Sequence, residues 1–206
     1  MSLAGSQQRT FLALVAALRP HWRRDRHLPA RIQSLLAGNR AFGSRDRRLY
    51  RELLYTTLRY LPWIERVLDR DPDEAARLVA WLAADAPATE RFRSALLGDL
   101  PPCPSSIEAK ARTAAEVFPS LHETCRADEL LPDWFRADCP EAFTSDQIDA
   151  LLARAPLWLR VQAHDVSAAA AEFAQLGWSV RPSPVLPTAL HLQGEVDVTK
   201  TSASQK

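Results

Sequence analysis

Residues 43–61 read GSRDRRLYRELLYTTLRYL, the longest stretch of this 206-residue chain with helical periodicity. At about 100° per residue, the apolar side chains between Leu49 and Leu61 cover about 140° of a helix surface. The opposite side carries a basic stripe made of Arg48, Arg51, Tyr55 and Arg59. The sequence therefore predicts an amphipathic helix over residues 44–61, with one buried face and one basic face.

The basic stripe has two interpretations. Guanidinium groups bind phosphate bidentately and stack on unpaired bases, so a stripe of arginine and tyrosine suits contacts with RNA. Alternatively, Asp46, Glu52 and the arginines pair with one another on a solvated helix surface. The helix by itself favours neither interpretation over the other.

The charge of the chain is strongly segregated. The 26 basic and 25 acidic residues give a net charge of only +1 at pH 7. Residues 1–70, however, hold 14 arginines and 5 acidic residues, a net charge of +9, and residues 71–206 carry −8. Codon composition explains the preference for arginine over lysine but not this segregation, which favours an anionic partner at the N-terminal end.

The overall composition is that of an ordinary globular protein, with 47% hydrophobic and 25% charged residues. No apolar stretch approaches the roughly 20 residues that cross a bilayer, and the N-terminus lacks the basic start of a secretion signal. The three cysteines, Cys103, Cys125 and Cys139, are widely spaced and predict no disulfide framework. We therefore expect a cytoplasmic protein with no membrane partner.

Further helices are predicted on both sides of the amphipathic segment. Their signals are serine or threonine caps such as Ser6 and Ser105, prolines in a first turn and glycines after a last turn. Asp71-Pro72 with an acid at the third helical position is one such start. These predicted helices span about residues 6–18, 29–38, 62–68, 72–82, 92–97, 105–118, 132–138 and 144–152.

The pattern changes to strands in the last third of the chain. Residues 157–162, LWLRVQ, alternate and have high β-propensity, and an alanine-rich helix that Ser167 would cap follows them. Further strands are predicted near residues 178–180 and 189–192. The order β-α-β-β indicates a small, incomplete α+β domain of the ferredoxin or RRM type.

Together these patterns predict an α+β protein built from two packed subdomains. A helical domain comes first, the small α+β domain follows, and the end of the chain lacks apolar periodicity, which is typical of a disordered tail. The predicted bounds are 1–127 for the helical domain, 128–198 for the α+β domain and 199–206 for the tail.

Signatures of catalysis are missing from the sequence. It contains no glycine-rich nucleotide loop, no H-E-x-x-H, no G-x-S-x-G and no C-x-x-C. Cys103 lies between prolines without a histidine nearby in sequence, which predicts an inert thiol. His122 and Cys125 provide only two metal ligands, too few for a site. We therefore predict no catalytic residue, no metal site and no cofactor site in this chain.

Several short motifs, in register over nearly the whole chain, resemble one family. GSxDRR at residues 43–48, followed by LLYxxLR at 53–59, resembles the N-terminal helical domain of the Sun/Fmu-type RNA (cytosine-5-)-methyltransferases, a domain similar to the NusB RNA-binding fold. LPDWF at 131–135 and PLWLRV at 156–161 resemble two later segments of that family. Gln162 departs from the pattern, because the family usually has asparagine there.

The resemblance implies an accessory role in RNA methylation. In that family, S-adenosylmethionine and two cysteines act in a catalytic domain that follows this region, and this chain ends before such a domain. The resemblance thus implies an RNA-recognition region that holds structured RNA, ribosomal or transfer, for cytosine-C5 methylation by the missing methyltransferase domain. We expect no DNA specificity, and RNA contacts from Arg23, Arg24, Arg45, Arg47, Arg48, Arg51, Tyr55, Arg59 and Arg160.

A second class of function stays open at this point. The helical part is also consistent with a protein-interaction module that docks on an acidic ribosome-assembly or transcription factor. Salt-dependent binding to RNA, without binding to acidic proteins, distinguishes the first class from the second.

Overall fold

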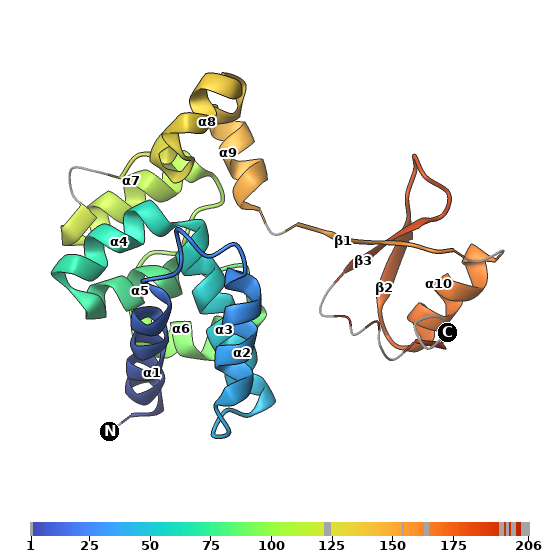
Figure 1. The fold of residues 1–206 in the computed structure, drawn as a ribbon, viewed down its shortest axis with the longest axis horizontal. Coiled ribbons are helices and arrows are strands. Elements are labelled where there is room, and N and C mark those ends of the chain that lie inside the picture. The colour runs from blue at the N-terminus through green and yellow to red at the C-terminus, as the bar shows by residue number, and fades with distance from the viewer. Residues whose placement is uncertain are drawn as a thin grey trace. The chain divides into compact units, whose positions relative to one another are not determined.

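The computed structural model describes residues 2–121, 125–153, 155–162, 165–193, 196, 198, 201 and 202. The chain divides into two compact units, Met1–Leu152 and Ala153–Lys206. The described part of the first unit contains helices only, and the second unit contains a small antiparallel sheet with one α-helix (Figure 1). This arrangement confirms the predicted α+β class.

Nine α-helices follow one another in the described part of the first unit, the number that the sequence predicts. They are α1 (Leu3–Leu18), α2 (Leu28–Gly38), α3 (Ser44–Arg59), α4 (Leu61–Arg70), α5 (Pro72–Leu82), α6 (Glu90–Leu97), α7 (Ile107–Val117), α8 (Asp133–Asp138) and α9 (Ser145–Leu152). Short 3-10 helices lie among them: η1 (Pro87–Thr89), η2 (Pro119–Leu121), η3 (Ala127–Leu130) and η4 (Pro140–Phe143). None of the described helices is long and apolar enough to cross a membrane.

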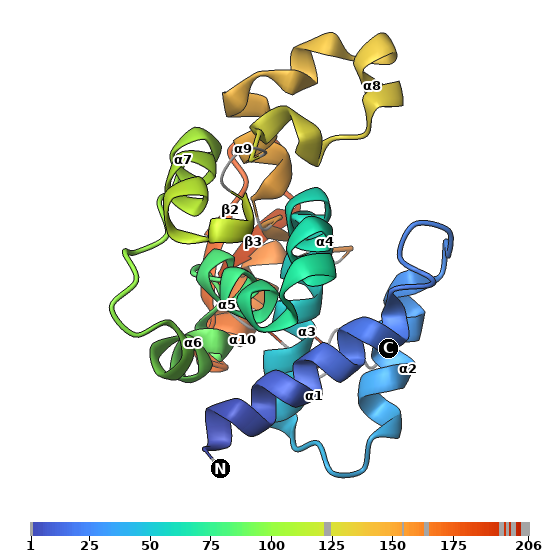
Figure 2. The same cartoon turned by 90° about the vertical axis from the view of Figure 1, so that its left-hand side faces the viewer.

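Helix α5 forms the centre of the helical unit. It lies between α4 and α6 and contacts both, as the two views agree (Figures 1 and 2). Almost every residue from Ala75 to Ala83 is buried, including the fully enclosed Trp81. Such a helix, apolar on nearly all sides, is typical of a core position.

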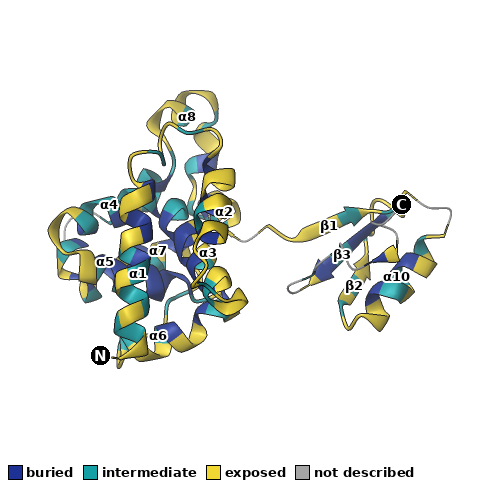
Figure 3. Ribbon diagram, turned by 60° about the horizontal axis from the view of Figure 1, so that its bottom comes forward, coloured by how far each residue is buried: buried dark blue, intermediate teal, exposed yellow. Residues whose placement is uncertain are grey.

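Helix α3 packs with the face that the sequence predicts. Its buried residues are Leu49, Tyr50, Leu53, Leu54, Thr56 and Thr57. In Figure 3 the buried residues of the helices face the interior of the unit, and the exposed residues form its outer surface. The helix ends at Arg59 rather than at Leu61, because Pro62 has no N–H to donate to a carbonyl of α3.

Asp71 caps α5 as the proline and acid pattern predicts. Its Oδ1 accepts hydrogen bonds from the backbone N–H groups of Asp73 at 2.9 Å and Glu74 at 3.0 Å. Replacing Asp71 by alanine leaves these two donors without their acceptor. We expect Asp71→Ala to lower the free energy of unfolding by about 1 kcal/mol in urea titrations followed by circular dichroism. Asp71→Asn, which keeps an acceptor oxygen, is the matched control and should stay close to the wild type.

The second unit contains three strands and one α-helix among its described residues. Strand β1 (Leu157–Arg160) is followed by α10 (Val166–Gln175), β2 (Ser179–Pro182) and β3 (Ala189–Gln193). The sheet order is β1-β3-β2, and β3 pairs antiparallel with both neighbours. Because α10 connects two strands that flank β3, the unit is a split β-α-β arrangement with a hairpin, as the predicted order requires.

Helix α10 covers one face of this sheet. Its buried residues Ala169 and Phe173 pack with Leu190 and Leu192 of β3, and β3 carries most of the buried residues of the sheet (Figure 3). Since neighbouring residues of a strand point to opposite faces, His191, which lies between these leucines, faces away from α10.

Three helix caps lie at other residues than predicted. Ser2, Ser106 and Asp165 accept the capping hydrogen bonds of α1, α7 and α10, whereas the sequence suggested Ser6, Ser105 and Ser167. The capping side chain must lie two or three residues before the backbone donor that it satisfies, and each of these starts has more than one serine or aspartate close to that spacing.

The division between the units differs from the predicted boundary at 127/128. Residues 128–152 belong to the helical unit, because Leu130 of η3 and Ile148 of α9 are buried in its core. The indole Nε1 of Trp63 in α4 also donates a hydrogen bond to the carbonyl oxygen of Arg126, at 3.0 Å. The apolar sides of η3 and α9 are thus buried against helices.

Two residues of the predicted disordered tail, Thr201 and Ser202, make defined contacts within the second unit. Thr201 is buried, and the backbone N–H of Ser202 donates to Glu172 Oε1 at 2.6 Å. The hydroxyl of Ser202 donates to Oε2 of the same carboxylate at 2.9 Å. The backbone N–H and the hydroxyl of Thr201 donate to the carbonyl oxygen of Val198. These two positions of the predicted disordered tail therefore have defined hydrogen-bond partners. The other residues of 199–206 lie outside the described residues.

Candidate nucleic-acid interface

A groove with a volume of about 580 Å³ lies between α2 and α3. Its α2 wall consists of Pro29, Ala30, Ile32, Gln33, Leu36 and Ala37, and its α3 wall of Arg47, Arg51 and Tyr55. The three α3 residues are spaced four apart, so they follow one another along a single side of the helix. The groove therefore joins a wall that is apolar except for Gln33 to a basic and aromatic wall.

The sequence positions these two walls through a short connection. Phe42 precedes α3 and packs its ring against Tyr50, with 4.9 Å between the ring centroids. Ile32 and Leu36 anchor α2 in the core, where they are 1% and 5% exposed. Because both helices are fixed by these buried side chains, the arginines of α3 project beside α2 from a rigid base.

The groove suits a ligand with both charge and flat rings. The side chain of Arg51 is 48% exposed, and Tyr55 is 37% exposed. Guanidinium groups at the surface bind phosphate oxygens, and a tyrosine ring beside them offers a stacking surface for a base. The apolar α2 wall adds contact area for the uncharged part of such a ligand.

Two contacts bear on the alternative in which acids neutralise the α3 arginines. The carboxylate Oδ2 of Asp46 accepts a hydrogen bond from the backbone N–H of Gly43 at 3.0 Å, so this acid caps the helix. Arg51 Nε lies 4.0 Å from Glu52 Oε1, at the limit of an ion pair. An exposed pair at this distance contributes little and leaves the guanidinium able to bind another anion.

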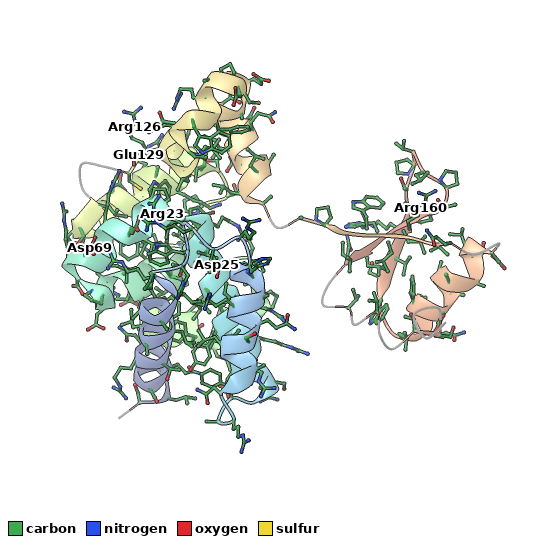
Figure 4. The ribbon with its side chains drawn as sticks, viewed as in Figure 1. Arg23, Asp25, Asp69, Arg126, Glu129 and Arg160 are labelled. Atoms are coloured by element: carbon green, nitrogen blue, oxygen red, sulfur yellow. The ribbon has the colours of Figure 1, made fainter. Side chains whose placement is uncertain are left out.

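The other predicted contact residues have varied positions. Arg45 and Arg48 are exposed on α3, and Arg59 is half-buried near its C-terminal end. Arg24 is exposed in the turn after α1. Arg160 lies on β1 in the second unit (Figure 4). The structure thus brings Arg47, Arg51 and Tyr55 together in one groove, and contacts from the remaining residues stay predictions.

Arg23 is engaged within the protein. Its guanidinium forms an ion pair with Glu65 of α4, and the hydrogen bond to this carboxylate raises the pKa of Arg23. The charge of Arg23 is therefore partly compensated, which weakens its case as an RNA contact relative to Arg47 and Arg51.

Several other basic residues connect segments of the helical unit. Arg19, just after α1, pairs with Asp69 of α4 at 2.5 Å, and Arg66 pairs with Glu129 of η3 at 2.8 Å. Figure 4 labels Asp69 and Glu129 within this unit. Part of the N-terminal positive charge thus serves the fold.

The cysteines do not have the environment of a nucleophile. Burial raises the pKa of the Cys103 thiol to about 11 and that of Cys125 to about 12. Hydrogen bonding with Glu141 raises the pKa of Cys139. All three are free thiols, and a raised pKa keeps a thiol protonated and unreactive near neutral pH.

Metal and cofactor sites were also predicted to be lacking. Within the part of the chain that the structure describes, no group of three or more potential metal ligands is found, and His122 lies outside that part. The family resemblance implies S-adenosylmethionine for a catalytic domain outside this chain, and this stays a prediction. The strand pairs are antiparallel, and the sequence has no glycine-rich cofactor loop.

The described residues of the second unit form a small α+β domain built on a split β-α-β unit. Residues 130–199 match the family described as "Methyltr_RsmF/B-like, ferredoxin-like domain". This match supports a relation of the chain to methyltransferases of the RsmF/B type. No curated protein and no solved structure matches the chain significantly.

The matched range, residues 130–199, begins and ends within two residues of the predicted α+β domain at 128–198. It contains two of the segments that carried the resemblance, 131–135 and 156–161. It also includes residues 130–152, which pack in the helical unit, so the family's domain extends across the division between the two units. The likeness of the helical domain to NusB rests on residues outside the match and stays a prediction.

Sequence reasoning missed the α2 wall of the groove. Pro29, Ile32, Gln33 and Leu36 recur at helical spacing, which marks one side of a helix. The spacing does not tell which helix packs beside this side of α2. Only the packing of α2 on α3 brings it next to the arginines of α3.

Proposed function

We propose that residues 1–206 form the RNA-recognition region of an S-adenosylmethionine-dependent RNA cytosine-C5 methyltransferase related to the RsmF/B type. In this proposal the groove between α2 and α3 holds structured RNA, ribosomal RNA in the first place, for a methylating domain outside these residues. The observation that carries the proposal is the alignment of Arg47, Arg51 and Tyr55 along one wall of that groove.

The electrostatics support an anionic ligand at this groove. Residues 1–70 have a net charge of +9, and both α2 and α3 belong to this part of the chain. Arg47 and Arg51 are about one helical turn apart, about 6 Å along the axis, so their guanidinium groups are placed for successive phosphates of one strand. Tyr55 continues the line by another turn and supplies a ring for an unpaired base.

The test of this proposal is the salt dependence of RNA binding by the whole chain. A fluorescently labelled RNA stem-loop is titrated with the protein at 50 and 200 mM KCl, and anisotropy reports the bound fraction. With about three phosphate contacts, the affinity should fall by about fortyfold between the two salt concentrations.

Polyglutamate of matched charge is added as a competitor to separate the two classes of partner. We expect polyglutamate to leave the RNA bound, since carboxylates on a flexible chain offer no bases to Tyr55. Displacement of RNA at equal charge concentration would contradict the proposal and favour an acidic protein partner.

The proposal places the cofactor outside this chain. We therefore expect calorimetric titration with S-adenosylmethionine to give no heat of binding, because the sequence has no glycine-rich cofactor loop. Titration of the same sample with the RNA stem-loop, which should give heat, is the control for an active preparation. Micromolar binding of S-adenosylmethionine would overturn this part of the proposal.

A further inference from the structure

The face of the small sheet that points away from α10 carries a row of three side chains, one from each strand. Trp158 of β1 lies opposite His191 of β3, and His191 lies opposite Arg181 of β2. Since neighbouring strands are about 4.8 Å apart, the row spans about 10 Å across the sheet. It uses every described strand of the unit.

The first two members of this row form a flat, preassembled surface. The rings of Trp158 and His191 are stacked, with 4.9 Å between their centroids and 29° between their planes. Trp158 is nevertheless 47% exposed, so a large part of the indole is in contact with solvent. A ring that is held in place and still accessible loses little side-chain entropy when a second ring stacks on it.

The charge of this face is positive. Arg160 follows Trp158 by two residues on β1 and therefore points to the same side of the sheet, and both Arg160 and Arg181 are exposed. The other described strand residues on this side are Ser179, Ala189 and Gln193, so the described part of the face contains no carboxylate. A stacking surface flanked by two guanidinium groups is complementary to a ligand that has both rings and negative charge.

We propose that this face, the sheet platform of Trp158, Arg160, Arg181 and His191, binds a single-stranded RNA segment. One unpaired base stacks on Trp158, while Arg160 and Arg181 bind the phosphates that flank it. The proposal rests on the proposed function for the nature of the ligand, but it assigns a second site in a different unit. The groove takes structured RNA through α3, and the sheet platform takes an unpaired segment.

The test uses the full chain and two labelled RNAs, a 12-nucleotide oligouridine and a closed stem-loop. Trp158→Ala removes the stacking ring, and we expect it to weaken oligouridine binding about tenfold. Trp158→Phe, which keeps a ring, should recover most of the affinity. Trp134→Ala is the matched control, because Trp134 is 70% exposed on α8 in the helical unit.

Because Trp158 is 47% exposed and lies outside the buried cluster beneath α10, circular dichroism of Trp158→Ala should match the wild type. Arg160→Ala provides a second variant that leaves the stacked rings in place. Arg160→Ala should also weaken oligouridine binding and reduce its salt dependence. Wild-type affinity of both variants for oligouridine would overturn the sheet platform, and so would equal weakening by Trp134→Ala.

The two sites can fail separately in this design. If the groove alone binds RNA, the Trp158 and Arg160 variants bind both RNAs as the wild type does, which overturns the sheet platform only. If the wild type binds oligouridine but not the stem-loop, and Trp158→Ala loses the former, the sheet platform stands and the groove proposal fails. Displacement of oligouridine by polyglutamate at equal charge would indicate a protein ligand and overturn the proposal.

Discussion

Reversing the charge of the two groove arginines, in Arg47→Glu with Arg51→Glu, is expected to weaken binding of an RNA stem-loop by about a hundredfold. Each wild-type guanidinium is placed to make charge-assisted hydrogen bonds to a phosphate, and each glutamate repels that phosphate instead. Two lost contacts should also lower the slope of log affinity against log salt by nearly two units. Anisotropy titrations at several salt concentrations measure both quantities.

The matched control reverses two arginines elsewhere on the helical unit. Arg91 of α6 and Arg112 of α7 are exposed, and Arg91→Glu with Arg112→Glu changes the net charge by the same amount. If the groove is the binding site, this control should lose far less affinity than the groove variant. Equal losses in the two variants would mean that binding follows net charge alone, and unchanged binding in the groove variant would exclude the groove as the RNA-binding site.

Trp63→Ala is expected to lower the free energy of unfolding by about 3–5 kcal/mol. Trp63 has no exposed surface, its ring lies 5.7 Å from that of Tyr60, and its Nε1 donates to the carbonyl oxygen of Arg126 at 3.0 Å. The substitution leaves a large cavity beneath α4 and an unsatisfied carbonyl just before η3. Urea unfolding followed by circular dichroism and tryptophan fluorescence measures the loss.

Trp134→Ala is the control for this variant too. It removes the same indole from a position that is 70% exposed, where a substitution should change stability by only about 0.5 kcal/mol. Trp63→Phe should lose less stability than Trp63→Ala, since a smaller cavity remains. Similar losses for Trp63→Ala and Trp134→Ala would contradict the position of Trp63 in the core.

The sequence by itself determined the local elements of this protein. The periodicity of residues 44–61 predicted which face of α3 is buried, because a helix places every third or fourth residue on one side wherever it packs. Asp71 predicted the start of α5, since capping depends only on a few neighbouring residues. The alternation around Trp158 and the helix after it predicted the split β-α-β order for the same local reason.

The tertiary structure decided which of these faces meet. The sequence placed residues 128–152 with the sheet, yet η3 and α9 bury Leu130 and Ile148 among helices, because any apolar surface of the right shape can remove them from water. The sequence predicted the arginines of α3 as contacts, but it did not predict that residues of α2 form the other wall of a groove beside them. The strand register aligns Trp158, His191 and Arg181 in one row. This register depends on pairing between segments far apart in the chain, so the local periodicity of each strand does not predict it.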